Sequence, residues 1–225
     1  MKNTLRSIKN GIKGRKLIAS SSKENEFDQA VYGESQFKDR TTLVYDNYAS
    51  VVFDHFKPVS FMDVGCANGF LVNALLNKGV DANGIEGADA AYKYMPEKVL
   101  PLVHKLDLRE NWDEYFYSKI GRKFEVVNFT EVAEHLKPEH EDRMLKNIRM
   151  LVGSFLVMSW SAEWDEYRGT DKQEHFNPRS KKYVIEKMEA IGLDFRKTLT
   201  EAINQDLGKL RVYEHWKNNI LVFKL

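Results

Sequence analysis

The stretch Phe61-Met62-Asp63-Val64-Gly65-Cys66-Ala67-Asn68-Gly69 decides the fold predicted for this chain. Its apolar first part is typical of a short buried strand, and its small residues are typical of a tight turn that opens a helix. The next apolar run, residues 80–86, ends at an acid, Glu86. A small-residue turn followed by an acid at the next strand end indicates a cofactor site in an α/β sheet.

The spacing of the turn argues against a dinucleotide cofactor. A dinucleotide fingerprint has glycine at its first, third and sixth positions. Counted from Gly65, the third and sixth positions hold Ala67 and Phe70. Two of the three glycines are therefore missing, which disfavours a nicotinamide-dependent oxidoreductase. The turn instead has an acid, Asp63, two residues before its first glycine and Gly69 four residues after it.

Strand and helix patterns alternate along most of the chain. Helices are predicted over residues 41–56, 70–77, 112–120, 138–151 and 180–191, with a further helix after Asp89, and strands over residues 61–64, 80–86, 102–106, 124–129 and 154–159. This alternation predicts a mostly parallel sheet with helices on both faces. Residues 193–200 and 211–225 are predicted to form two closing strands without a helix between them, and hence an antiparallel hairpin at one edge.

Composition and length favour one domain. The 225 residues are 43% hydrophobic, which suffices for a substantial core. No apolar run is long enough to span a bilayer, and the N-terminus lacks the apolar core of a signal peptide. Cys66 is the single cysteine, which excludes an internal disulfide framework and fits a cytoplasmic setting. We predict a polar extension over residues 1–40 and one domain over residues 41–225.

The charge is unevenly distributed. Seven of the 34 basic residues lie in residues 1–23, which contain no acid, so the rest of the chain has 27 basic and 33 acidic residues. A domain with this net negative charge is a poor non-specific binder of nucleic acid. The basic arm is open to three interpretations: a solvated terminus, a contact with phosphates or an acidic membrane face, or a transit peptide.

The turn of residues 61–69 resembles the first motif of the S-adenosylmethionine-dependent methyltransferases. Residues 124–136 look like the fourth strand of the small-molecule branch of this family, in which a Glu-x-x-Glu-His segment follows the strand. His175-Phe176-Asn177 before a helix is a weaker similarity. The resemblance covers about residues 41–225 and implies a Rossmann-like, doubly wound sheet, mostly parallel with an antiparallel C-terminal strand. It also implies S-adenosylmethionine as the cofactor.

The resemblance places the cofactor at the carboxyl ends of the strands. Glu86 would accept both ribose hydroxyls. Asp107 would accept from the adenine amino group with Leu108 beside the ring, or would instead cap the next helix. Asn128 and Phe129 would lie near the transferred methyl. The expected cofactor contacts are Tyr45, Asp63, Gly65, Cys66, Ala67, Gly69, Glu86, Gly87, Asp107, Leu108, Asn128 and Phe129.

Each residue of the turn has an expected part. Gly65 and Gly69 would let the backbone pass close to the ligand, and Asp63 would fix backbone or water around its amino-acid end. Ala67 replaces the family's commoner glycine, which requires that its φ be negative. Cys66 has no activating neighbour in the sequence and belongs to the turn rather than acting as a nucleophile. Tyr45 and Tyr48 lie in a segment that folds over the cofactor in this family, or else belong to the core.

The implied reaction is in-line transfer of the sulfonium methyl group to a nucleophile. A hydroxyl acceptor also needs a general base, for which His135, His175 and Glu131 are the candidates. Glu131 and His135 could instead pair with each other on a helix turn. No His, Asp or Glu cluster shows metal-ligand spacing in the sequence, which predicts that no metal is required.

The acceptor is the least determined part of the prediction. Trp160, Trp164, Tyr167 and His175 could line an acceptor pocket, or belong to the core or its rim. A small polar metabolite or a sugar or glycan hydroxyl is the preferred acceptor. A protein or RNA acceptor is the alternative, with the basic arm as its support. A catalytically silent binding module is disfavoured because Gly65, Gly69 and Glu86 are all present.

Overall fold

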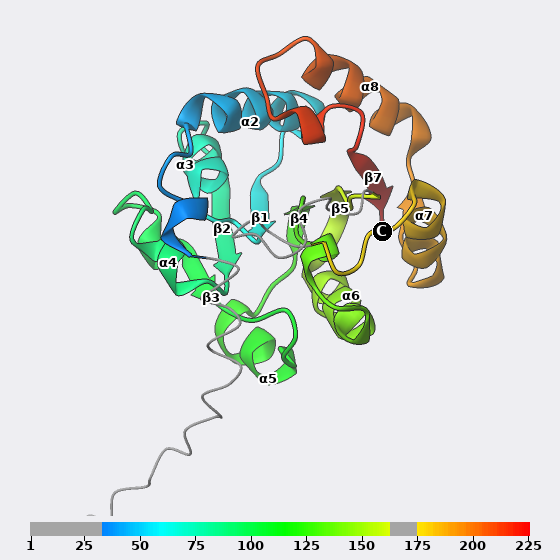
Figure 1. Cartoon of the computed structure of the whole chain (residues 1–225), viewed down its shortest axis with the longest axis horizontal. Coiled ribbons are helices and arrows are strands. Elements are labelled where there is room, and N and C mark those ends of the chain that lie inside the picture. Colours follow the sequence, from blue (N-terminus) through cyan, green and yellow to red (C-terminus); the bar gives the residue numbers. More distant parts are fainter. Residues whose placement is uncertain (1–32, 163–174) are drawn as a thin grey trace, which may run out of the picture.

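The computed structural model describes residues 33–162 and 175–225 (Figure 1). In these residues the strands are β1 (Ser60–Val64), β2 (Asp81–Glu86), β3 (Val103–Lys105), β4 (Phe124–Phe129), β5 (Val152–Met158), β6 (Asp194–Phe195) and β7 (Leu221–Lys224). The α-helices are α2 (Thr42–Phe56), α3 (Phe70–Leu76), α4 (Asp89–Tyr92), α5 (Asp113–Tyr115), α6 (Glu141–Leu151), α7 (Lys181–Ala190) and α8 (Lys197–Gly208). Short helical turns are η1 (Glu34–Gln36), η2 (Leu100–Leu102), η4 (Ala133–His135), η5 (Pro138–His140) and η6 (Glu214–Trp216), and η3 (Phe116–Ile120) is a π-helix.

The described strands form one sheet in the order β3-β2-β1-β4-β5-β7-β6. Strands β1 to β5 are parallel, and β7 is antiparallel to both β5 and β6. The chain runs outward from β1 through β2 to β3 and then returns to β4 on the other side of β1. The predicted doubly wound, mostly parallel sheet is confirmed. Its switch point lies between β1 and β4, where Asp63 is paired with Asn128.

Helices cover both faces of the sheet (Figure 1). Each face has its own apolar core. Helices α2, α3 and α8 pack on one face, where α2 buries Val44, Tyr48 and Val52 at helical spacing. Helices α6 and α7 pack on the other, where α6 buries Met144 and Ile148. The switch point is therefore covered by helices on both faces of the sheet.

The predicted C-terminal hairpin is wrong. Residues 197–200, predicted as strand, begin α8, which separates the two-residue β6 from β7. The antiparallel pairing at the sheet edge does exist, but a helix connects its strands. The side chains that α8 buries, Thr200, Ile203 and Leu207, recur at helical rather than alternating spacing. Thr200 also accepts a hydrogen bond at Oγ1 from the backbone of Val222 at 2.9 Å, which holds α8 against β7.

The packed part of the molecule begins before residue 41. Phe37 is buried in the core, and its carbonyl accepts a hydrogen bond from Asn68 Nδ2 at 2.8 Å. The last residues of the predicted extension therefore pack on the domain, whereas the basic arm of residues 1–23 lies outside the described residues. Within residues 33–162 and 175–225, none of the helices has the length and apolar character needed to cross a membrane.

Candidate functional site

The turn after β1 has left-handed backbone at three positions. Gly65, Ala67 and Gly69 have φ values of 75°, 48° and 65°. The amides of Gly65 and Cys66 both donate to the carbonyl of Ile85, which ties the turn to the end of β2. The expectation that Ala67 would avoid positive φ is therefore wrong. An alanine in this conformation carries strain of about 1–2 kcal/mol, which the surrounding contacts offset.

The two glycines of the turn are required by the protein's own packing. A Cβ on Gly69 would lie 2.6 Å from Cγ1 of Val99, and a Cβ on Gly65 would overlap Cγ2 of Val132. The sequence predicts that the two glycines allow close approach to a ligand. Close approach to valines of two other segments is a second reason for them. Val132 belongs to the segment after β4, so Gly65 lets that segment pack directly on the turn.

Glu86, at the end of β2, holds the turn in place. One of its carboxylate oxygens accepts from the amide of Ala67 at 2.8 Å, and the other accepts from the amide of Ala88 at 2.7 Å. Burial raises the pKa of Glu86, and these backbone hydrogen bonds partly offset that rise. Each carboxylate oxygen can accept a second hydrogen bond. Glu86 can therefore anchor the turn and still accept two hydroxyl groups.

Asp63, Asn128 and Tyr48 form a buried hydrogen-bonded chain at the switch point. Asn128 donates from Nδ2 to Asp63 Oδ1 at 2.8 Å, and its Oδ1 accepts from the hydroxyl of Tyr48, also at 2.8 Å. Burial raises the pKa of Asp63 to about 7, with the hydrogen bond from Asn128 opposing the rise and the charge of Glu86 adding to it. The side chain of Asn128 is thus committed to joining β1, β4 and α2.

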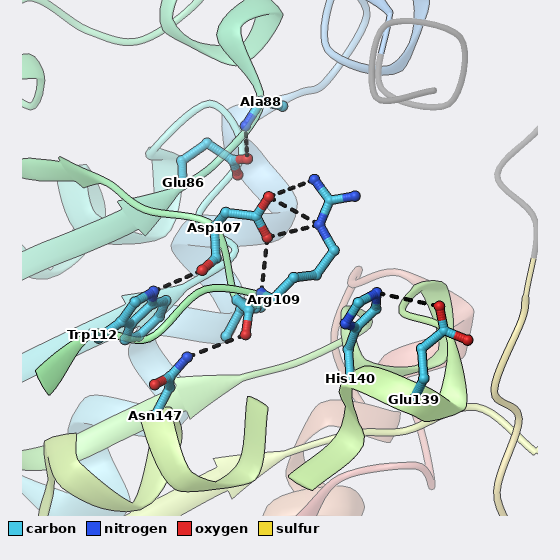
Figure 2. Close-up of polar contacts among 9 residues, drawn as sticks. Glu86, Ala88, Asp107, Arg109, Trp112, Glu139, His140 and Asn147 are labelled. Atoms are coloured by element: carbon cyan, nitrogen blue, oxygen red, sulfur yellow. Dashed lines mark hydrogen bonds and ion pairs between the residues drawn. The ribbon is translucent and has the colours of Figure 1, made fainter. Parts of the chain in front are cut away.

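The loop after β3 is held by three side chains (Figure 2). Arg109 donates from Nε to both carboxylate oxygens of Asp107 at 2.9 Å and pairs with it again through Nη2. Trp112 donates from Nε1 to the carbonyl of Asp107 at 2.7 Å. Asn147 of α6 donates to the carbonyls of Leu108 and Glu110. This loop is therefore preorganised beside Glu86.

The environment of Asp107 removes one of its two predicted roles. The next helix, α5, begins after Trp112 and has no side-chain cap, so helix capping by Asp107 is wrong. Burial would raise the pKa of Asp107, but the hydrogen bonds and charge of Arg109 outweigh it and lower the pKa. The carboxylate is thus charged and held by Arg109, and the adenine contact stays a prediction.

The remaining predicted contacts differ in exposure. Cys66 is buried, and a Cβ on Gly84 of β2 would lie 2.7 Å from its Sγ. Burial raises the pKa of this thiol, which fits a structural part rather than a nucleophilic one. Phe129 is fully buried in the core under α6. Tyr45 is nearly buried, and its hydroxyl accepts from Arg40 at 2.6 Å.

Gly87 and Leu108 lie where β2 and β3 end. Gly87 is exposed, and a Cβ there would lie 3.2 Å from the carbonyl of Leu106. Leu108 is half-buried against the core under α6. Both follow strand ends next to Glu86 and Asp107, as the sequence predicts.

The candidate catalytic residues gather beyond β4. Glu131 has φ of 56° and lies before the helical turn that starts at Ala133, so the predicted helix-turn arrangement of Glu131 and His135 is not formed. Glu131 accepts at Oε1 from Ser159 at 2.6 Å and from Asn219 at 3.3 Å. The rings of His135 and His175 are 5.0 Å apart, centroid to centroid, in an edge-to-face arrangement.

Glu134 completes this group. Its carboxylate, the Nδ1 or Nε2 of His135 and that of His175 all lie within 4.8 Å of one another. Spacing along the sequence does not reveal this cluster of potential metal ligands, because the fold brings His175 to residues 134 and 135. Burial raises the pKa of Glu134 well above its ordinary value, and Glu131 adds to the rise.

His215 and Arg40 are neighbours of this group that sequence reasoning missed. Burial lowers the pKa of His215, and the charge of Glu131 opposes the change. The charge of Arg40 lowers the pKa of both Glu86 and His215. The sequence offers a weak signal for His215, which stands in the aromatic run Tyr213-Glu214-His215-Trp216 near the end of the chain.

The residues predicted to line an aromatic acceptor pocket have different outcomes. Trp160 is buried and donates from Nε1 to the carbonyl of Asn177 at 2.6 Å, so it belongs to the core. Trp164 and Tyr167 lie outside the described residues. A cavity of about 610 Å³ lies beside α6, where η3 and α7 complete its lining. None of the predicted site residues is among the residues that line this cavity.

Comparisons with solved structures identify the fold. A SAM-dependent methyltransferase from Archaeoglobus fulgidus matches with a TM-score of 0.59 and 16% identity, over 91% of this chain and 100% of that one. Magnesium protoporphyrin IX methyltransferase from Synechocystis, with bound SAH, matches with a TM-score of 0.52 and 14% identity, over 87% and 84% of the two chains. The chain has the fold of the class I S-adenosylmethionine-dependent methyltransferases.

Sequence comparison adds one partial match. Ubiquinone biosynthesis O-methyltransferase of Nitrosomonas europaea is 27% identical over 90 residues. The match covers 40% of this chain and 38% of that protein, which is less than half of either. No protein-family profile matches the chain.

Proposed function

We propose that this chain is an S-adenosylmethionine-dependent methyltransferase whose catalytic domain includes residues 41–225. The observation that carries the proposal is the carboxylate of Glu86, which is fixed by the amides of Ala67 and Ala88 at the carboxyl end of β2, beside the turn that follows β1. Two hydroxyls on neighbouring carbons of a ribose match the two acceptor oxygens of such a carboxylate. The fold and the partial match to an O-methyltransferase support the same activity.

The proposed cofactor site combines an acidic contact with a rigid backbone. Glu86 would hold the ribose, and the preorganised loop of Asp107 and Leu108 would hold the adenine. The turn of residues 65–69 would face the amino-acid end, with Asp63 behind it. Bound S-adenosylmethionine supplies an electrophilic methyl group on a sulfonium. The chain's part is to place an acceptor atom about 3–3.5 Å from that methyl and in line with the sulfur.

We propose O-methylation of a small polar acceptor, such as a sugar or glycan hydroxyl. The acidic Glu131 and the histidines beyond β4 support a hydroxyl acceptor, because such an acceptor needs hydrogen-bond acceptors and a base. His215 joins His135, His175 and Glu131 as a candidate base, since its lowered pKa keeps the imidazole neutral near pH 7. A protein or RNA acceptor remains the alternative, supported by the basic arm.

The proposal is tested by calorimetric titration of the purified chain with S-adenosylmethionine and, separately, with NAD. We expect saturable binding of the former and none of the latter. Glu86→Gln should weaken binding of S-adenosylmethionine by about 1–3 kcal/mol, because one acceptor oxygen becomes a donor that opposes one backbone amide and one ribose hydroxyl. Glu97→Gln, an exposed acid on the segment after α4, is the matched control and should bind as the unmodified chain does.

Two results would contradict the proposal. Tight binding of NAD with no heat from S-adenosylmethionine would indicate a different cofactor. Unchanged affinity in Glu86→Gln would mean that Glu86 serves only to anchor the turn. Thermal unfolding of both variants separates a binding defect from a folding defect, since the amides of Ala67 and Ala88 depend on the same carboxylate.

A further inference from the structure

The group beyond β4 contains more ligating chemistry than a general base requires. Glu134 and His135 are adjacent in the turn η4, and His175 reaches them from forty residues further along the chain. One carboxylate oxygen and one nitrogen from each ring lie within 4.8 Å of one another. For bonds of about 2.1 Å, ligand atoms around one metal ion lie about 3–3.5 Å apart. Side-chain rotations of modest size would therefore bring the three atoms onto one ion.

The carboxylate of Glu134 is the second and independent observation. Its side chain is fully buried, and within residues 33–162 and 175–225 neither carboxylate oxygen has a hydrogen-bond partner of ordinary distance and angle. A buried acid without such partners is costly to a protein, and proteins retain buried charges when they are paired or coordinate metals. A second acid, Glu131, lies near enough to raise the cost further. A bound cation would compensate both carboxylates.

The backbone fixes His175 in this position. The amides of Phe176 and Asn177 both donate to the carbonyl of Glu134, at 2.8 and 2.9 Å. Trp160 holds the carbonyl of Asn177 from the core side. The segment that carries His175 is thus attached directly to the residue whose carboxylate it faces. This attachment preorganises the three side chains as a unit.

We propose that Glu134, His135 and His175 bind a divalent transition-metal cation. Two imidazoles and one carboxylate suit Mn²⁺, Fe²⁺ or Zn²⁺ better than Mg²⁺, which prefers oxygen ligands throughout. Three protein ligands leave positions open on the ion, as at catalytic rather than structural metal sites. The proposal goes beyond methyl transfer, because cation binding is measured without cofactor or acceptor.

The site lies where an acceptor would enter if the proposed function holds. An oxygen of the acceptor could then take an open position on the cation, which would lower the pKa of a coordinated hydroxyl. His135 and His175 would serve as ligands rather than as bases. His215, whose pKa is raised by the charge of Glu131 and lowered more strongly by burial, would be left as the candidate base.

The test uses the full chain after treatment with a chelator, titrated with MnCl₂ and monitored by the loss of the free Mn²⁺ signal in electron paramagnetic resonance. We expect one saturable site per chain. Glu134→Gln and His175→Ala should each lower the affinity of the chain for Mn²⁺ at least tenfold. His104→Ala is the matched control, because His104 lies on β3 on the far side of β1 and should leave the affinity unchanged. Calorimetry with ZnCl₂ and MgCl₂ ranks the metals.

The outcomes are distinct from those of the cofactor titration. No saturable Mn²⁺ or Zn²⁺ site, or equal affinity in Glu134→Gln, His175→Ala and His104→Ala, would overturn the proposal. Mg²⁺ binding as tight as Mn²⁺ binding would overturn its assignment to a transition metal. Thermal unfolding provides a folding check, and Mn²⁺ should raise the midpoint of the unmodified chain but not that of His175→Ala. A chain that binds S-adenosylmethionine but no cation would refute this inference alone.

Discussion

Asp63 shows how the switch point constrains a single residue. It lies in the middle of the sheet between β2 and β4, is 5% exposed and accepts a hydrogen bond from Asn128. Burial without a nearby cation favours the protonated carboxyl. The sequence identified this acid as part of the turn motif, but its ionisation depends on the neighbouring strand and on Glu86, which lie 65 and 23 residues further along the chain.

Asp63 should make the stability of the fold depend on pH. Its pKa rises from 3.8 to about 7 on folding, so the folded state binds a proton that the unfolded state releases. The free energy of unfolding should therefore fall as pH rises from about 4 through 7. Between pH 5 and 8 the loss from this one group is about 2–3 kcal/mol. Asp63→Asn removes the titratable carboxyl group while keeping an oxygen that can accept a hydrogen bond from Asn128.

The measurement is urea unfolding of both chains across pH 5–8. The stability of Asp63→Asn relative to the unmodified chain should increase with pH by the amount given above. Asp46→Asn, an exposed acid on α2, is the control and should track the unmodified chain at every pH. Parallel curves for Asp63→Asn and the unmodified chain would mean that Asp63 is ionised in the folded state throughout.

At the scale of elements, the turn between β1 and α3 is shaped by segments packed on it. Gly69 has φ of 65° and faces Val99, and Gly79 has φ of 81° with open space around it. Alanine at either position carries the strain of left-handed backbone, but only at Gly69 does its methyl group meet another side chain. Comparing alanine variants at the two positions therefore separates the cost of backbone strain from the cost of the close contact with Val99.

Gly69→Ala should destabilise the fold more than Gly79→Ala. We expect a cost of about 1–2 kcal/mol at Gly79 from backbone strain and a further cost of about 1–3 kcal/mol at Gly69 from overpacking. The measurement is the free energy of unfolding in urea. Val99→Ala should rescue part of the loss in Gly69→Ala and none in Gly79→Ala. Equal losses for the two alanine variants would show that Val99 moves aside freely.

The elements differ in how far their sequence determines them. The order of strands and helices up to residue 191 is readable because each buried face repeats with the period of its own element. The same period is present in α8, where Leu199, Ile203 and Leu207 recur every four residues, but the strand predicted over residues 193–200 includes the first four residues of this helix. The left-handed φ of Ala67 could not be predicted, because it depends on the amide contact with Glu86 from another strand.

At the scale of the whole molecule, the cofactor and acceptor sides of the site differ in predictability. The proposed cofactor contacts follow strand ends in chain order, so a motif can identify them. The group beyond β4 instead combines Glu131, Glu134 and His135 with His175, which comes from a separate segment of the chain. Only the folded chain brings these residues together. The potential metal ligands were therefore invisible to spacing arguments, although Glu134 and His135 are adjacent in the sequence.

Glu141 connects the parts of the molecule that carry this group. It lies at the start of α6, is nearly buried, and accepts hydrogen bonds from Tyr183 of α7 at 2.5 Å, from Asn177 at 3.2 Å and from Arg179 at 3.1 Å. Lys187 of α7 lies 3.1 Å from the same carboxylate. One charge thus joins α6, α7 and the segment that follows His175.

Glu141→Gln should therefore loosen two elements at once. Replacing a buried, multiply paired carboxylate by a neutral amide removes the ion pair of Arg179 and leaves Lys187 only its longer contact with Asp142, so we expect a loss of about 2–4 kcal/mol in the free energy of unfolding. Glu139→Gln, two residues earlier and two-thirds exposed, is the control and should cost less than about 0.5 kcal/mol. Hydrogen exchange at the amides of Phe176 and Asn177 should quicken in the first variant only. Unchanged exchange there would show that the backbone contact with Glu134 alone holds the segment, independently of α6.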